Sequence, residues 1–302
     1  MAGGVGVIDI GSVSACLQLA DHGPRTSACK YPTRLGREIR PDGALSRRGV
    51  RRVVRAAGAT LEAARELGVR ELFCFATASV RDASNRDEIV RAVERSVGLR
   101  PQFMTGRQEG KLTYHAARHW SGETGRLLLL DIGGGTSEVV LGASDTPELA
   151  LSLPLGAGTL TREFLRKDPP SGKDVRRLER HVRRAIDRLP DNPSADRVVA
   201  ASRILTQLAR LADRGDSLRV SDLDRWIPRL SELSAARRAR LRGVSAARAP
   251  YVLAGAIVAR AMMTRLEVSE VDICPWTLRE GILLRHLRGG RGELPLRPLR
   301  LR

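Results

Sequence analysis

The chain has 302 residues, of which 42% are hydrophobic and 3% aromatic, and its formal net charge at pH 7 is +18. The length and hydrophobic content predict a globular protein with two domains. No apolar stretch reaches the roughly 18 to 20 residues that span a bilayer, and the N-terminus lacks the basic and apolar regions of a signal peptide, so we expect a cytoplasmic protein without a membrane partner.

The excess of basic residues indicates an anionic partner, because a field of this sign concentrates phosphates, nucleic acids or acidic surfaces. The low aromatic content and the absence of a recognised reader motif argue against a specific nucleic-acid partner. An inorganic polyanion fits the composition better. A bias towards arginine, with most of these side chains simply solvated, is the alternative explanation. The four scattered cysteines form no metal-type pair and fit reduced core thiols rather than a disulfide framework.

The first part of the chain alternates predicted strands with predicted helices, a pattern that is typical of an α/β domain. Strands and helices are distinguished by apolar runs, by helical spacing of apolar residues and by glycine stop signals. In chain order the predicted elements are strands at Val5–Asp9 and Leu17–Ala20, a helix at Leu45–Leu67, a strand at Leu72–Phe75, a helix ending near Val97, a strand at Gln102–Met104 and a helix from Thr105.

The pattern starts again after Gly122–Gly125, so we place a domain boundary near Arg126. The expected domains cover residues 1–125 and 126–288, and the arginine-rich segment 289–302 is expected to form a basic flexible tail. The predicted elements of the second domain are a strand at Leu127–Asp131, a strand beginning at Glu138, a helix at Asp174–Leu189, a short strand at Val198–Ala200 and a late strand at Val271–Cys274.

A duplicated motif is the most informative feature of the sequence. VGVIDIGS begins at Val5, and LLLLDIGGGTSE begins at Leu127. In each copy a buried strand ends in an aspartate, and the glycines that follow allow backbone N–H groups to face an anion. Two such loops facing each other across a cleft would hold a phosphate chain and its metal ion, since Mg²⁺ prefers one or two carboxylates together with substrate oxygens and water.

Other polar residues are ambiguous from the residues alone. Glu109 follows a helix start and, without further information, fits an ordinary exposed helix glutamate. Arg81 follows a strand and is either a phosphate ligand or an ion-pair partner of Asp82. His115 and His119 are four residues apart and could share a metal, but the sequence shows no third ligand, so core or surface histidines are the favoured interpretation.

Taken together, these motifs resemble the exopolyphosphatase and guanosine pentaphosphate phosphohydrolase family, whose fold is the duplicated actin-like ATPase (ribonuclease H-like) fold with two domains flanking a cleft. The resemblance extends from Val7 to about His286. Within this family, the sequence is most similar to the short two-domain exopolyphosphatases of actinobacteria. The motifs that carry it, in chain order, are VIDIGS, TRLG, ATASVRDASNR, TGRQEGKL, LLLLDIGGGTSEVVLG, LSLPLGAGTLTREFL, the Arg248-Ala249-Pro250 region leading into LAGA, and ICPWTLREGILLRHL.

The resemblance implies an exopolyphosphatase that releases terminal orthophosphate from inorganic polyphosphate with Mg²⁺ or Mn²⁺. The alternatives are a 5′-phosphohydrolase of guanosine pentaphosphate (pppGpp) and a catalytically weak regulator that binds polyphosphate or alarmones. A homodimer is implied by the resemblance only. The implied site residues are Glu109 as general base; Asp131, Glu138 and Asp9 at the metal; and Gly11, Ser12, Arg81, Gly133, Gly134, Gly135, Thr136 and Ser137 at the phosphates.

Three positions depart from the usual pattern of this family. Val13 stands where an asparagine is common, and Gln108 replaces the acid that commonly precedes the catalytic glutamate. The turn from Ala200 to Arg203 replaces a loop that usually contains glycine.

Overall fold

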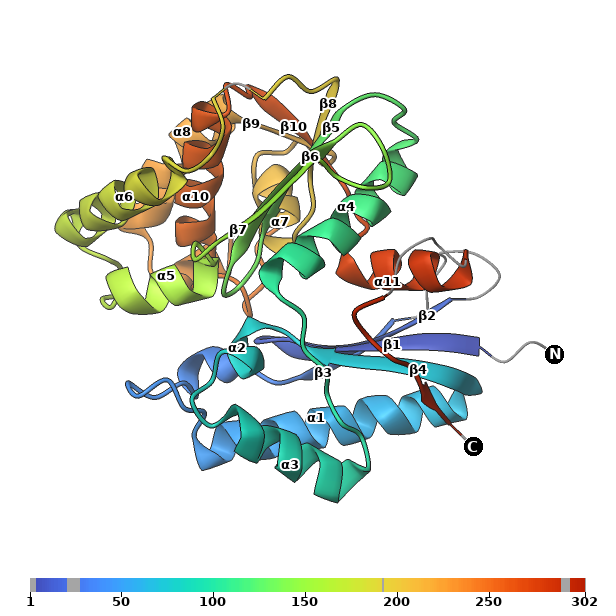
Figure 1. Cartoon of the computed structure of the whole chain (residues 1–302). Helices are drawn as coiled ribbons and strands as arrows, with labels where there is room; N and C mark the ends of the chain where they lie inside the picture. Colours follow the sequence, from blue (N-terminus) through green and yellow to red (C-terminus); the bar gives the residue numbers. More distant parts are fainter. Residues whose placement is uncertain (1–3, 21–27, 192, 289–293, 302) are drawn as a thin grey trace. The chain divides into compact units, whose positions relative to one another are not determined.

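The computed structural model describes residues 4–20, 28–191, 193–288 and 294–301. These residues form two compact units, which are described in turn (Figure 1). The first unit comprises Met1–Gln108 and Arg279–Arg302, and the second comprises Glu109–Leu278. Within the described ranges, no helix is both long enough and apolar enough to cross a membrane.

The sheet of the first unit has the strand order β11-β4-β1-β2-β3. β1 runs antiparallel to β2 and parallel to β4, and β2 runs antiparallel to β3. The strands are β1 (Gly4–Ile10), β2 (Ser14–Ala20), β3 (Ala28–Pro32), β4 (Val69–Ala76) and β11 (Leu299–Arg300).

Helices cover both faces of this sheet, with α1 and α3 on one face and α11 on the other (Figure 1). The hydroxyl of Ser46 caps α1 by accepting a hydrogen bond from the Gly49 N–H, which satisfies one of the unpaired N–H groups at the helix start. Ile8 and Ile10 of β1 are buried in the same core as α1. The helices are α1 (Arg47–Glu66), α2 (Ala78–Arg81), α3 (Arg86–Val97), α11 (Leu278–Leu287) and the short 3-10 turn Leu35–Arg37.

The sheet of the second unit has the strand order β7-β6-β5-β8-β10-β9. β5 runs antiparallel to β6 and parallel to β8, and β6 runs antiparallel to β7. The strands are β5 (Leu127–Ile132), β6 (Ser137–Gly142), β7 (Leu149–Leu153), β8 (Arg197–Ala200), β9 (Ser217–Arg219) and β10 (Glu270–Ile273).

The side chains of β5 alternate between two cores on the two faces of this sheet. Leu128 and Leu130 join the large core that contains the buried helix α10, whereas Leu127 and Leu129 pack with Tyr114 of α4. Asp131 follows the alternation of Leu127 and Leu129 and therefore lies on the α4 face. The helices are α4 (Gly106–Ser121), α5 (Ala157–Phe164), α6 (Gly172–Ile186), α7 (Arg203–Leu211), α8 (Val220–Glu232), α9 (Ala235–Arg238) and α10 (Val252–Arg265).

The two units repeat one topology. β3-β2-β1-β4 in the first unit and β7-β6-β5-β8 in the second have the same order, with three antiparallel strands followed by a parallel neighbour of the aspartate-bearing strand. The prediction of a duplicated α/β fold from the two motif copies is therefore confirmed.

The units divide the chain at different positions from those expected. The expected boundary near Arg126 is replaced by divisions after Gln108 and after Leu278. α4 belongs mainly to the second unit because Tyr114 packs against β5, while α11 belongs to the first because His286 contacts Phe73 of β4 edge to face. Apolar contacts between elements far apart in sequence thus decide where the units separate.

The expected tail at 289–302 also needs correction in its described part. Leu299 and Arg300 form β11 and pair with β4, and Leu296 is 3% exposed. The sequence of this segment does not predict a strand, because only two of its residues pair with β4 and such a short strand has no recognisable pattern. The part of the expected tail at 289–293 lies outside the described residues.

One smaller expectation also differs. Of the strand expected at Gln102–Met104, only Gln102 forms a bridge, with Phe75. Phe103 packs at the edge of the first core and Met104 is 2% exposed, so these two apolar residues make core contacts rather than strand pairs.

Candidate functional site

Three polar residues form a row across neighbouring strands of the second sheet. Asp131 of β5 is directly opposite Glu138 of β6, and Glu138 is directly opposite Ser152 of β7. Side chains of directly opposed residues project from the same face of a sheet, with Cβ atoms about 5 Å apart. The hydroxyl of Ser152 donates a 2.8 Å hydrogen bond to Oε1 of Glu138, which is 3% exposed. The row therefore places two carboxylates on the α4 face and fixes one of them.

The first turn of α4 brings a third carboxylate close to this row. Glu109 acts on the charge state of Asp131, and burial together with the Glu109 carboxylate raises the pKa of Asp131 to about 7. Gly110 makes this approach possible, because a Cβ at this position would lie 3.1 Å from Cβ and Cγ of Glu138. The Glu-Gly pair thus combines an acidic side chain beside Asp131 with the space that the helix needs against β6.

Thr113, one turn further along α4, links the same groups. Its Oγ1 lies 3.0 Å from the Glu109 carbonyl oxygen, and its side chain hydrogen-bonds Asp131, which partly offsets the rise in the pKa of that carboxyl. Gln108 acts at the other end of the turn, where its side-chain oxygen accepts hydrogen bonds from the N–H and hydroxyl of Thr105. Gln108 therefore helps to start the helix that presents Glu109, as a capping-box residue does.

The glycine turn after β5 is held from behind by the start of α5. The carbonyls of Gly133 and Gly134 accept hydrogen bonds of 3.0 Å from the N–H groups of Ala157 and Gly158, and the Gly135 carbonyl accepts one of 3.2 Å from Gly156. In a trans peptide the N–H points away from the C=O of the preceding residue. The N–H groups of Gly134, Gly135 and Thr136 are therefore turned away from α5, in the orientation that an anion cradle needs.

Gly156 is required for this packing. A Cβ there would lie 2.1 Å from the backbone carbon of Gly135, a distance that no real contact allows. The GAGT segment that follows β7 thus acts as a support for the glycine turn. Its supporting role depends on a contact between distant parts of the chain, which no pattern of neighbouring residues indicates.

Ser137 is placed differently from the expected phosphate ligand. It is fully buried, and its hydroxyl donates a 2.8 Å hydrogen bond to the Leu155 carbonyl. The hydroxyl therefore supports the loop from inside. Thr136 next to it is partly exposed.

The first loop is supported in the same manner by the TRLG segment. Ser12 and Val13 direct their carbonyls towards it: the Leu35 N–H donates a 2.6 Å hydrogen bond to Ser12, and the N–H groups of Thr33 and Arg34 donate hydrogen bonds of 3.0 and 3.1 Å to Val13. The following N–H groups are consequently turned away from this segment. Val13 contributes through its backbone, which any residue can supply.

The carbonyl of Gly11 is held as well. The Thr33 hydroxyl, which is completely buried, donates a 2.7 Å hydrogen bond to it. Gly11 also donates its own N–H to the Ser14 carbonyl at 3.0 Å. The first turn is therefore fixed along its length.

Asp9 lies at the end of β1 with a cationic neighbour that the sequence analysis missed. A guanidinium nitrogen of Arg279 lies 4.0 Å from Oδ2 of Asp9, and the Arg279 side chain is 11% exposed. A buried arginine at this distance balances the charge of the aspartate. The distance in sequence between the two residues explains why no pattern indicated the pair.

Arg81 makes the ion pair that was one of its two expected roles. Its Nε and a terminal nitrogen donate hydrogen bonds of 2.8 and 3.2 Å to the two Asp82 carboxylate oxygens, and its other terminal nitrogen donates one of 3.1 Å to the Met104 carbonyl. These hydrogen bonds fix the orientation of the Arg81 guanidinium at the end of α2.

The donor set of the second unit fits a hard divalent cation. Asp131 and Glu138 offer carboxylate oxygens on one sheet face, where burial and the nearby Glu109 carboxylate both raise the pKa of Asp131 and a cation would favour its charged form. Oxygen ligands of this kind suit Mg²⁺ or Mn²⁺ rather than a metal that prefers nitrogen or sulfur.

The chain is similar to known proteins over most of its length. The Ppx/GppA phosphatase family model matches residues 24–289. Exopolyphosphatase 1 of Mycobacterium tuberculosis is 38% identical to the chain, with 94% of this chain and 88% of the relative covered. The crystal structure of the Aquifex aeolicus member of the Ppx/GppA family matches with a TM-score of 0.78 and 27% identity over 96% of this chain and 99% of that one. An exopolyphosphatase structure from Cytophaga hutchinsonii, 20% identical, has the same fold with a TM-score of 0.83 over 95% of this chain and 99% of that one.

Proposed function

Because the chain belongs to the Ppx/GppA phosphatase family, we propose that it is an exopolyphosphatase that releases orthophosphate from the end of inorganic polyphosphate. The observation that carries the proposal is the position of Glu109 beside Asp131 on the sheet face that also bears Glu138. The strongly basic composition supports a long polyanionic substrate.

In this proposal Glu109 is the general base that takes a proton from the attacking water. A carboxylate suits the role because it can accept a hydrogen bond from the water and take up its proton. Phosphoryl transfer requires alignment and charge neutralisation more than covalent help. No protein nucleophile is therefore needed.

Asp131 and Glu138, together with Asp9, are proposed to hold Mg²⁺ or Mn²⁺. When bound, the ion supplies positive charge that stabilises phosphoryl oxygens. Ser152 keeps Glu138 in place through its 2.8 Å hydrogen bond, and this is the kind of outer support that orients a carboxylate ligand.

The remaining residues are proposed to bind phosphate. Backbone N–H groups of the two turns offer donors without charge. Gly11 and Gly133 contribute through the tight turn itself, because their own N–H groups donate to the Ser14 and Thr136 carbonyls. The planar guanidinium of Arg81 suits phosphate oxygens once substrate competes with Asp82. The residues in this group are Gly11, Ser12, Arg81, Gly133, Gly134, Gly135 and Thr136, with Ser137 acting through its backbone.

Phosphate release from polyphosphate in the presence of Mg²⁺ tests the proposal. Glu109→Gln removes the base but keeps the shape of the side chain, so we expect turnover to fall by about 10² to 10⁴-fold. Glu62→Gln, at an exposed position of α1, is the matched control and should retain full activity. Equal turnover of the wild type and Glu109→Gln would remove the enzymatic proposal.

The same assay separates the two alternatives. Turnover of pppGpp that exceeds turnover of polyphosphate would make the chain a guanosine pentaphosphate phosphohydrolase. Tight polyphosphate binding, with turnover equal to that of Glu109→Gln, would indicate a binding protein. Sedimentation of the same samples tests the homodimer.

A further inference from the structure

A cluster of two histidines and one aspartate lies on α4, separate from the carboxylates described above. Ligand atoms of His115, His119 and Asp145 all lie within 4.8 Å of one another. The two imidazole centroids are 5.1 Å apart, and Nδ1 of His115 lies 3.8 Å from Oδ1 of Asp145. At 1.5 Å of rise per residue, the histidines lie about 9 and 15 Å along the helix axis from Glu109. The sequence showed no third ligand because Asp145 follows β6, far along the chain.

The loop that carries Asp145 is fixed by α4 itself. The Tyr114 hydroxyl lies 3.0 Å from the Ser144 carbonyl oxygen, and a terminal nitrogen of Arg118 donates a 2.6 Å hydrogen bond to the Ala143 carbonyl. Both anchoring side chains come from the helix that carries the histidines. The aspartate is thus held next to the histidines by groups that do not themselves act as ligands, as in a preorganised site.

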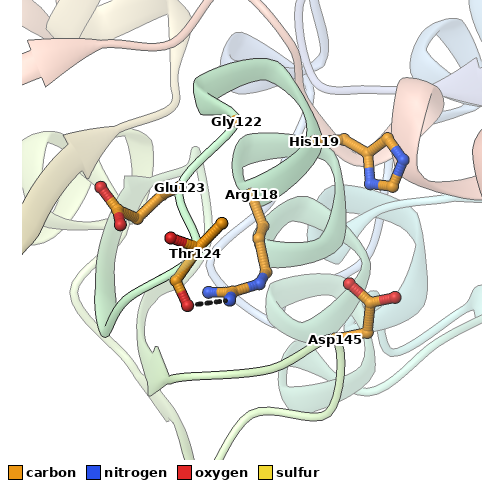
Figure 2. A pocket seen from close by; sticks show the side chains of 6 residues that line it. All are labelled: Arg118, His119, Gly122, Glu123, Thr124 and Asp145. Atoms are coloured by element: carbon orange, nitrogen blue, oxygen red, sulfur yellow. Dashed lines mark hydrogen bonds between the residues drawn. The ribbon is translucent and has the colours of Figure 1, made fainter.

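The cluster borders an open pocket. A surface pocket of about 430 Å³ has His119 and Asp145 in its wall (Figure 2). His115 is deeply buried, with 7% of its side chain exposed, whereas the Asp145 side chain is 66% exposed and faces the pocket. The other lining residues are Arg118, Gly122, Glu123 and Thr124.

The positive charge of Arg118 is directed towards backbone oxygens around the pocket. Its terminal nitrogens donate hydrogen bonds of 2.9 Å to the Gly125 carbonyl and 3.0 Å to the Thr124 carbonyl. Glu123 adds a second carboxylate to the wall. The charge balance of the pocket therefore permits a cation near Asp145.

The geometry points to a binding site for a divalent transition-metal ion of the Zn²⁺ type, with His115, His119 and Asp145 as ligands and the fourth position open to the pocket. Two histidines at i and i+4 on one helix face are a common source of zinc ligands. Imidazole with one carboxylate selects Zn²⁺, Co²⁺ or Ni²⁺ over Mg²⁺. Ligand atoms of a tetrahedral site are about 3.4 Å apart for bonds of about 2.1 Å. Because the three ligand atoms already lie within 4.8 Å of one another, no pair needs to approach by more than about 1.4 Å.

Co²⁺ titration of the metal-free full-length protein tests the site. Millimolar Mg²⁺ is present throughout to saturate the oxygen-only carboxylate site, and visible absorption reports nitrogen coordination of Co²⁺. We expect one Co²⁺ per chain in the wild type, displaced stoichiometrically by Zn²⁺. His119→Gln and Asp145→Asn should each lower the Co²⁺ affinity by about 100-fold or more. Changing a group that only supports a metal ligand costs roughly 10 to 100-fold, so a loss of this size indicates a direct ligand.

His181→Gln is the matched control, because this histidine lies on α6 against Phe164. It should bind Co²⁺ as the wild type does, and all variants should release phosphate with Mg²⁺ at the wild-type rate. Absence of a Co²⁺ spectrum in the wild type, or an unchanged spectrum and affinity in both ligand variants, overturns the inference. Neither result affects the polyphosphatase proposal, whose test depends on Glu109.

Discussion

Ser152 donates a 2.8 Å hydrogen bond to Glu138 from the directly opposite position on the neighbouring strand. The carboxylate is almost completely buried and lies in the same row as Asp131. A hydroxyl is a suitable partner here, because it donates to the charged carboxylate without adding a charge that would compete with a metal ion. Ser152 thus orients the Glu138 carboxylate without itself offering a negatively charged ligand.

Ser152→Ala is expected to weaken activation by Mg²⁺. Loss of the hydroxyl leaves Glu138 less firmly oriented, so the Mg²⁺ concentration for half-maximal phosphate release should rise by about 10-fold. Ser231→Ala, which removes a hydroxyl bonded to the Pro228 carbonyl on α8, is the control. An unchanged Mg²⁺ requirement in Ser152→Ala would contradict the positioning role.

The raised pKa of Asp131 predicts how stability depends on pH in the metal-free protein. Its ordinary value is 3.8 and its value in the fold is about 7, so the native state holds a proton that the unfolded chain releases at a lower pH. The stabilising contribution is complete below about pH 3.8 and is lost as the pH rises through about 7. The wild type should therefore lose stability relative to Asp131→Asn over this range.

Urea unfolding without metal at pH 5 and pH 8 measures the effect. The free energy of unfolding of Asp131→Asn relative to wild type should increase by about 3 kcal/mol between the two conditions, because the native carboxyl stays protonated over about two pH units, from pH 5 to its pKa of about 7, at roughly 1.4 kcal/mol per unit. Asp187→Asn, at the exposed end of α6, should show no such trend. A constant difference between wild type and Asp131→Asn would show that the carboxyl titrates normally.

The C-terminal segment is expected to stabilise the first unit. Leu296 is 3% exposed, and the Gln102 amide both donates to and accepts from the Arg297 backbone at 2.7 and 2.9 Å. Leu296→Ala should lower the free energy of unfolding by about 2 to 4 kcal/mol, as for other buried leucines. Leu299→Ala is the control, since this side chain is 40% exposed and should change stability by less than about 0.5 kcal/mol. Equal midpoints in chemical denaturation would indicate that the segment contributes no core.

The sequence predicted those parts of the site whose signals are local. A buried strand that ends in aspartate and glycine located Asp9 and Asp131 correctly at strand ends, and TGRQEGKL located a helix start at Glu109. These signals depend on residues that are neighbours in the chain. The significance of Glu109 still required the resemblance, because an exposed helix glutamate has the same local pattern.

The parts that were missed depend on contacts between distant segments. Arg279 beside Asp9, and Ser152 beside Glu138, follow from how helices and strands pack rather than from any motif. A single serine in the apolar strand LALSL was the one available hint for Ser152. The same reason explains why the compact units separate after Gln108 rather than near Arg126, since apolar packing of α4 against β5 decides its unit.

Gly156→Ala is expected to disable the glycine turn without unfolding the protein. The backbone of Gly156 has φ −69° and ψ 134°, which alanine adopts easily, so only the Cβ position 2.1 Å from the Gly135 backbone is forbidden. The turn must shift to make room, and a displacement of about 1 Å at a reacting phosphate costs on the order of 100-fold in turnover. Gly172→Ala at the start of α6 is the matched control, because its Cβ would meet only the flexible end of Arg176 at 3.3 Å. That control should retain activity, and far-ultraviolet circular dichroism should show native helix content in both variants. Full activity in Gly156→Ala would mean that the turn does not depend on the support of α5.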